Sequence, residues 1–111
     1  MNTITFDERR CVYKKAIQHY GSLLQTTVAI EELAELQKEL CKILRNPSHI
    51  TNYANLTEAL ADVTIMLEQI REIYNVNAEV CACMDYKVAR LDDRIREDEK
   101  NQPVRGEQRS V

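Results

Sequence analysis

Glycine and proline are nearly absent from this chain, and the few that occur divide it into long uninterrupted segments. The 111 residues include two glycines and two prolines. Gly21 and Pro47 separate long stretches that contain neither residue, and Pro103 and Gly106 fall in a polar C-terminal segment. Because glycine and proline are the main residues of tight turns and the strongest helix breakers, their scarcity argues against a sheet protein with many turns. The chain is therefore predicted to be all-α.

Four helices are predicted from capping residues and from apolar residues that recur every three or four positions. Thr5 followed by Glu8, and Asn55 followed by Glu58, have the spacing of a helix N-cap and its partner three residues on. The predicted helices cover residues 6–20, 22–45, 56–74 and a last segment that follows Asn77 and ends near Glu99.

Leucines provide much of the apolar stripe expected on the second and third helices. The stripe on the second helix consists of Leu33, Leu36, Leu40, Ile43 and Leu44, and the stripe on the third consists of Leu60, Val63, Leu67 and Ile70. Antiparallel packing of helices joined by short connections buries such stripes, so the expected architecture is an antiparallel bundle of about four helices. A core this thin favours a homo-oligomer, a dimer or a tetramer.

Composition limits the organisation and location of the protein. The length suits a single core, so residues 1–99 are expected to form one helical domain and residues 100–111 a mobile tail. The net charge of -3 argues against nucleic-acid polymers as partners, because their binding depends on clustered Lys and Arg. No apolar run is long enough for a membrane span or a signal peptide, and we expect a cytoplasmic protein without a membrane partner.

A first group of acidic residues lies within the predicted second helix. Glu31, Glu32 and Glu35 are separated by intervals that place them on neighbouring surface of one helix. Taken alone, such a face is most simply interpreted as solvated, with Lys38 and Lys42 offsetting Glu35 and Glu39. This interpretation predicts no functional role for the three glutamates.

A second acidic face changes that interpretation. Glu58 and Asp62 are four residues apart and stack on one side of the predicted third helix. If the second and third helices are antiparallel, the two acidic faces approach each other and repel unless a cation lies between them. Mg²⁺ prefers hard oxygen ligands, and no histidine accompanies the acids to favour zinc. The pattern therefore predicts a site for Mg²⁺ as cofactor.

These acidic motifs resemble those of the all-alpha nucleoside-triphosphate pyrophosphohydrolases of the MazG-like type. The resemblance covers most of residues 12–95. It rests on ELAE (residues 32–35) preceded by Glu31, on EALAD (residues 58–62) followed by VTIMLEQI, and on YKVARL near the end of the fourth helix.

The resemblance implies an oligomeric enzyme that hydrolyses a nucleoside triphosphate to a monophosphate and pyrophosphate with Mg²⁺. It implies that Glu32, Glu35 and Asp62 are metal ligands. Glu31 is implied as a further ligand or as the catalytic base for the attacking water.

One position departs from the family pattern. The pattern has a glutamate three residues before the aspartate, and this chain has Ala59 there. Glu58 is one residue away, which rotates its side chain by about 100° around the helix, so it is expected to be an alternative or outer ligand. The departure leaves two functions open: an active pyrophosphohydrolase, or a weakened or inactive nucleotide-binding or regulatory protein of the same fold. A purely structural oligomer with solvated acids is a third interpretation.

Basic residues on the predicted fourth helix are candidates for binding the substrate's phosphates. Lys87, Arg90 and Arg94 recur at helical spacing, and the family often has basic residues in this region. The competing interpretation pairs Arg90 and Arg94 with acidic residues one turn away on the same helix.

Overall fold

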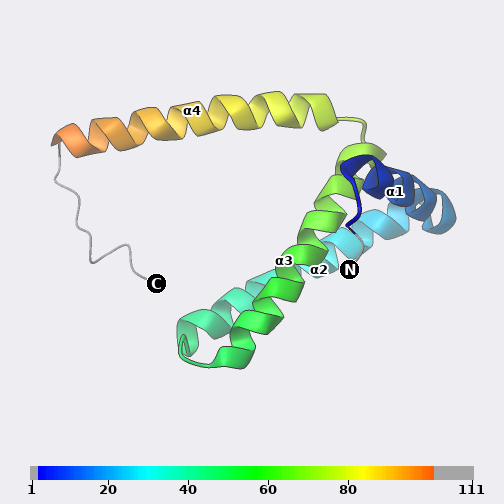
Figure 1. Ribbon diagram of the computed structural model, residues 1–111, viewed down its shortest axis with the longest axis horizontal. Helices are drawn as coiled ribbons and strands as arrows, with labels where there is room; N and C mark the ends of the chain where they lie inside the picture. The colour runs from blue at the N-terminus through cyan, green and yellow to red at the C-terminus, as the bar shows by residue number, and fades with distance from the viewer. Residues whose placement is uncertain (1–2, 102–111) are drawn as a thin grey trace. The chain divides into compact units, whose positions relative to one another are not determined.

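The computed structural model describes residues 3–101, and helices account for nearly all of them (Figure 1). Residues 3–101 contain no β-strand, so the predicted all-α class is confirmed. None of the helices in this range is long and apolar enough to cross a membrane. The helices are α1 (Phe6–Tyr20), α2 (Ser22–Arg45), α3 (Ile50–Ile73) and α4 (Asn77–Asn101).

The first two helices begin and end where the sequence predicts. The Thr5 hydroxyl accepts a hydrogen bond of 3.1 Å from the Glu8 backbone N–H and so caps α1. Gly21 adopts a φ of 92°, which a glycine adopts without strain, and its N–H donates to Ile17 O at 2.8 Å. Gly21 therefore ends α1 and lets α2 start in a new direction.

The third helix begins earlier than predicted. His49 occupies the N-cap position of α3, and Asn55 lies inside the helix, so the prediction of an Asn55 cap is wrong. The Asn52 side-chain amide donates to Lys42 O and to Asn46 O, both at 3.3 Å. Asn52 thus satisfies carbonyls at the end of α2, across a connection of four residues between the two helices.

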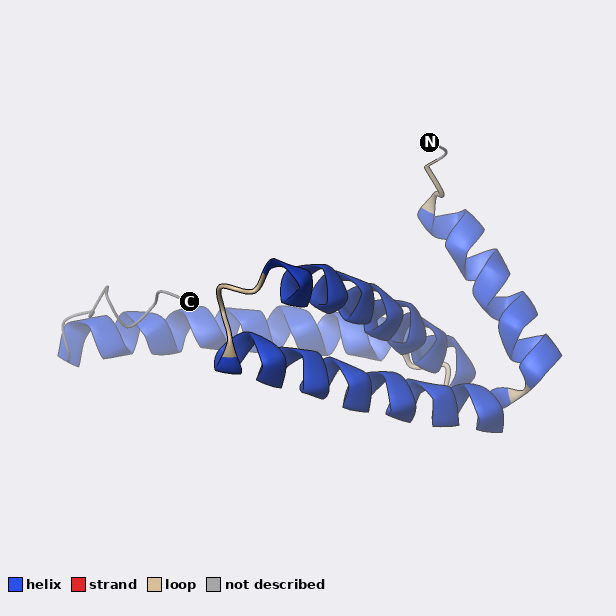
Figure 2. Ribbon diagram, turned by 90° about the horizontal axis from the view of Figure 1, so that it is seen from below, coloured by secondary structure: helices blue, strands red, loops and turns tan. Residues whose placement is uncertain are grey.

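Helices α2 and α3 form an antiparallel hairpin, seen from below in Figure 2. Small and apolar side chains at three- and four-residue intervals line its seam, together with a buried pair of glutamines, Gln25 and Gln69. The leucines of the predicted stripes lie mostly outside this seam: Leu33, Leu40, Leu60 and Leu67 are 40–47% exposed. The buried apolar residues are Tyr13, Ala29, Ile43, Ala59, Val63 and Met66.

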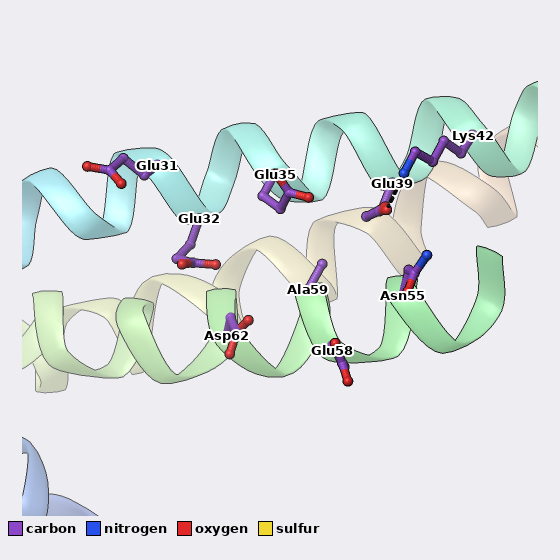
Figure 3. A pocket seen from close by; sticks show the side chains of 9 residues that line it. All are labelled: Glu31, Glu32, Glu35, Glu39, Lys42, Asn55, Glu58, Ala59 and Asp62. Atoms are coloured by element: carbon purple, nitrogen blue, oxygen red, sulfur yellow. Dashed lines mark hydrogen bonds and ion pairs between the residues drawn. The ribbon is translucent and has the colours of Figure 1, made fainter. Parts of the chain in front are cut away.

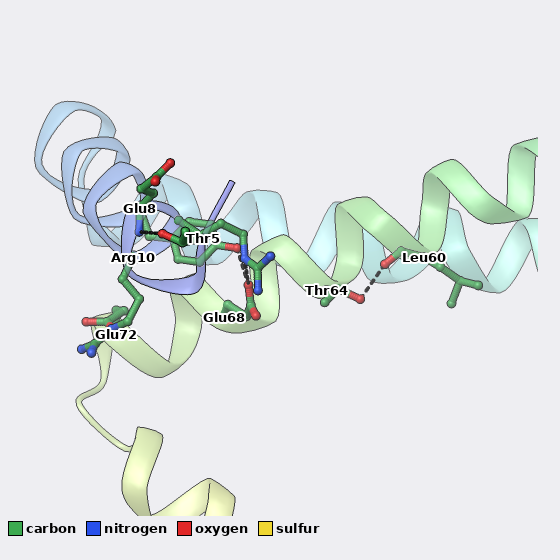
Figure 4. A network of polar contacts seen from close by, with 9 residues as sticks. Thr5, Glu8, Arg10, Leu60, Thr64, Glu68 and Glu72 are labelled. Carbon is green, nitrogen blue, oxygen red and sulfur yellow. Dashed lines mark hydrogen bonds and ion pairs between the residues drawn. The ribbon is translucent and has the colours of Figure 1, made fainter. Parts of the chain in front are cut away.

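Polar contacts join α1 to α3 (Figure 4). Arg10 Nε lies 2.6 Å from Glu72 Oε1, and the buried Tyr13 hydroxyl donates to Glu68 Oε1. Burial of the phenol, followed by the hydrogen bond to Glu68 and the negative charge of Glu68, raises the pKa of Tyr13 to about 12. The three helices thus form one packed body.

The described residues divide into two compact units, one up to Asn75 and one from Val76 on. The first unit contains α1 to α3, and the second contains α4. Asn75, with a φ of 51°, lies in the turn predicted at this point. The assignment of residues 1–99 to one domain stays a prediction. Of the predicted mobile tail, Lys100 and Asn101 belong to α4, and residues 102–111 lie outside the described residues.

Candidate metal centre

A cavity of about 520 Å³ lies along the α2–α3 hairpin, on the side of the connecting loop (Figure 3). Both predicted acidic faces line it. Its volume is in the range of pockets that hold small molecules, although its lining is far more acidic than that of most such pockets. The lining residues are Glu31, Glu32, Glu35, Glu39, Lys42, Asn55, Glu58, Ala59 and Asp62.

The register of the hairpin explains why the two faces meet. Gln25 Nε2 donates to Gln69 Oε1 at 2.8 Å near one end, and Asn52 contacts Lys42 O near the other. Between these contacts α2 advances from 25 to 42 while α3 runs back from 69 to 52, which is 17 residues on each helix. The helices therefore keep one register along the whole seam.

This register pairs particular positions across the cavity. It places Glu32 opposite Asp62, Glu35 opposite Ala59, and Glu39 opposite Asn55, and Figure 3 shows the same order along the two helices. Glu32 and Asp62, both predicted as metal ligands, thus face each other. Glu35, the third predicted ligand, faces Ala59, the position that departs from the family pattern.

The predicted carboxylates have few partners. Lys38 Nζ lies 3.5 Å from Glu35 Oε1, but both side chains are at least half exposed, so this pair contributes little to stability. Within residues 3–101, Glu31, Glu32, Glu58 and Asp62 have no ion-pair or hydrogen-bond partner. All four residues line the same cavity, but in Figure 3 the Glu58 side chain points away from α2, and no three acidic, His or Cys side chains of residues 3–101 are grouped to hold a metal ion.

Glu39 belongs to the site, although the sequence did not predict it. Its side chain is only 5% exposed, and Oε1 lies 3.1 Å from Lys42 Nζ. Its other oxygen, Oε2, is buried and has no hydrogen-bond partner in the described part of the chain. The available signal was its spacing, seven residues after Glu32 and four after Glu35, which places it on the same helix face.

The charge of the cavity is strongly unbalanced. Six carboxylates line it, and Lys42 is the single cationic side chain among its lining residues. Four of these carboxylates are exposed to solvent, which screens part of their mutual repulsion, and a bound divalent cation would reduce the repulsion further. All the acidic donors are carboxylate oxygens, and Asn55 adds an amide oxygen, so the donor set fits Mg²⁺.

The basic residues predicted to bind phosphate lie on α4, in the second unit. Lys87, Arg90 and Arg94 are all exposed. The Arg90 guanidinium lies 5.8 Å from the centre of the Tyr86 ring, and the ion pair observed on this helix joins Arg96 to Asp92 at 2.9 Å. Phosphate binding by these three residues stays a prediction.

Comparison with known proteins assigns no family to the chain. No family model, curated protein or solved structure matches the chain. The resemblance to the MazG-like type therefore rests on the quoted motifs, and the meeting of those motifs in one cavity is a separate observation about the fold.

Proposed function

We propose that the chain is a magnesium-dependent nucleoside-triphosphate pyrophosphohydrolase of the MazG-like type. The observation that carries this proposal is the α2–α3 hairpin, which brings two acidic motifs distant in sequence into one cavity with six carboxylates and one lysine. A triphosphate would be repelled from such a cavity unless metal ions neutralised its lining. The acidic lining and an anionic substrate are compatible only through a cation.

Each side chain has a chemical task in this proposal. Glu32, Glu35 and Asp62 would hold Mg²⁺, with Glu58 as an additional ligand, after rotations of their flexible side chains. Glu31 accepts the proton of the water that attacks the phosphorus, or serves as a further ligand. When bound, Mg²⁺ would supply charge neutralisation and polarisation at the scissile phosphorus. The bond between the α- and β-phosphates breaks, giving a nucleoside monophosphate and pyrophosphate.

The proposal includes a homo-oligomer, a dimer or a tetramer, located in the cytoplasm. The exposed leucines on α2 and α3 support it, because leucines at regular helical spacing are usually buried. Lys87, Arg90 and Arg94 of α4 are the proposed phosphate-binding residues. Sedimentation equilibrium measures the mass of the particle directly, and a monomer at micromolar concentration would contradict the oligomer.

The activity is tested by incubating the full chain with Mg²⁺ and a panel of canonical and modified nucleoside triphosphates. We expect pyrophosphate release by the natural chain and a decrease of about a hundredfold or more in Glu35→Gln, because removal of even an outer-shell partner commonly costs 10- to 100-fold. Glu8→Gln on α1 is the matched control, since this exposed glutamate lies outside the cavity. Pyrophosphate no higher than with Glu35→Gln would overturn the proposal.

A second candidate function is nucleotide binding without turnover. The observation that favours it is Ala59, whose buried methyl group lies opposite Glu35 where the family pattern has a glutamate. This candidate predicts that nucleotide binds the natural chain without being hydrolysed, and that Ala59→Glu gains activity. Turnover by the natural chain at a rate that Ala59→Glu does not increase would exclude it.

A further inference from the structure

We infer that Glu39 is a metal ligand of this site and supplies the carboxylate that Ala59 does not. The inference rests on the proposed function for the presence of a cation in the cavity, but it assigns a residue outside the family motifs. Two observations carry it: the burial of an unpartnered carboxylate oxygen, and the place of that carboxylate in the acidic cavity, between Ala59 and Asn55 along the hairpin.

The first observation concerns the state of the Glu39 carboxylate. Buried polar atoms in folded proteins nearly always have a partner, and leaving one without a partner is destabilising, most of all when the group is charged. Lys42 serves only Oε1, and Oε2 remains buried without a hydrogen bond. A cation bound to Oε2 gives this oxygen a partner. It also adds positive charge to a cavity in which Lys42 alone opposes six carboxylates.

The second observation is geometric. The Glu39 side chain extends from α2 toward the α3 side of the cavity and lies between Ala59 and Asn55 along the hairpin (Figure 3). Ala59 has only a methyl group there, so no α3 carboxylate competes with Glu39 for the space. Glu35 lies one helical turn before Glu39 on the same face. Glu39 can therefore complete a set of oxygen donors that starts with Glu35.

A purely structural ion pair with Lys42 is the competing explanation. A structural ion pair is normally either exposed, where its charges keep their hydration, or buried with all of its polar atoms hydrogen-bonded. The Glu39–Lys42 pair fits neither case, because Lys42 is 31% exposed while its partner is 5% exposed and half satisfied. Replacing each partner separately distinguishes the two explanations.

The test is a calorimetric titration of the full chain with Mg²⁺ alone, and with Mn²⁺ alone, in the absence of nucleotide. We expect Glu39→Gln to weaken metal binding at least about tenfold, as removal of metal-site partners commonly does. Lys42→Met leaves the carboxylate in place and removes a competing cation, so it should bind metal at least as tightly as the natural chain. Glu8→Gln should bind like the natural chain, and circular dichroism establishes that each variant is folded.

The outcomes separate this inference from the proposed function. Equal metal affinity of Glu39→Gln and the natural chain would overturn the role of Glu39 and leave the pyrophosphohydrolase proposal standing. Equal weakening by Glu39→Gln and Lys42→Met would show a structural pair and would also overturn it. Metal binding that depends on Glu39, in a chain that releases no pyrophosphate, would support the inference while the proposed activity fails. Absence of metal binding by the natural chain would overturn both.

Discussion

The two ends of the α2–α3 hairpin bury polar groups in opposite ways. At the end near α1, Gln25 and Gln69 are buried and hydrogen-bonded to each other, and Gln69 Nε2 also lies 3.5 Å from Met66 Sδ. At the end near the loop, Glu39 is equally buried but keeps one carboxylate oxygen without a partner. Both groups lie on the same seam, in the same register.

This difference indicates different tasks for the two ends. A pair of neutral amides satisfies itself across the seam and fixes how the helices align, as single buried polar residues do in coiled coils. A buried charge with a free oxygen destabilises the hairpin locally, and such exceptions gather at functional sites. The glutamine end satisfies its own polar groups, whereas the acidic end leaves a carboxylate oxygen without a partner, as the proposed metal site requires.

The largest effect is expected from breaking the glutamine pair. Gln69→Leu leaves the Gln25 amide buried without its partner, so the free energy of unfolding should fall by about 2 kcal/mol. The double variant Gln25→Leu/Gln69→Leu removes both polar groups and should recover most of that loss. Urea unfolding followed by circular dichroism measures both changes. A double variant as unstable as Gln69→Leu would contradict this explanation, because it would show that the cost does not come from an amide left without its hydrogen-bond partner.

Much of this fold was predictable from local sequence. Thr5, Gly21 and the residues around Asn75 act within one turn of the helix ends that they define, so their effect can be recognised without the tertiary structure. Asn55 was misassigned because the start of α3 depends on Asn52, which reaches back to the end of α2. Contacts between elements cannot be read from capping patterns alone.

The leucine stripes were misplaced for a related reason. Periodicity identifies an apolar face but not its partner: the seam that α2 and α3 share buries Ile43 and Val63 of the predicted stripes, together with alanines, Met66 and polar residues, but leaves most of the leucines exposed. The acidic motifs were found because each lies within a single helix. Glu39 was missed because Lys42, three residues later, made it resemble an ordinary surface pair. Its burial depends on α3 and could not be predicted from α2.

An intermediate effect is expected where α1 joins the glutamine end of the hairpin. Tyr13→Phe removes the hydroxyl that donates to Glu68, and it should lower the free energy of unfolding at neutral pH by about 1.5 kcal/mol, as for hydrogen bonds to charged groups. Tyr86→Phe on α4 is the matched control because Tyr86 is exposed. A loss no larger than that of the control would show that water replaces Tyr13 as the partner of Glu68.

The same tyrosine predicts how stability depends on alkaline pH. Folding raises the pKa of Tyr13 to about 12, whereas an unfolded tyrosine ionises near pH 10, so the folded state retains the proton over this interval. The contribution of Tyr13 is fully present below pH 10 and is lost as the pH rises through about 12. Unfolding free energies at several pH values should fall more steeply in this window for the natural chain than for Tyr13→Phe. Parallel curves would contradict the raised pKa.

The smallest effect, and the one of opposite sign, is expected at the acidic end. Glu39→Met replaces a half-satisfied buried carboxylate with an apolar side chain of similar length, and Lys42 is exposed enough to turn toward water. In buffer with a chelator the free energy of unfolding should rise by about 1 kcal/mol, in the direction seen when buried charges give way to apolar residues. Saturating Mg²⁺ should reverse the order, because a ligand bound only by the folded natural chain stabilises that chain. Glu97→Met, at an exposed position of α4, should change little in either buffer. A destabilised Glu39→Met in chelator would mean that the two ends of the hairpin both serve stability.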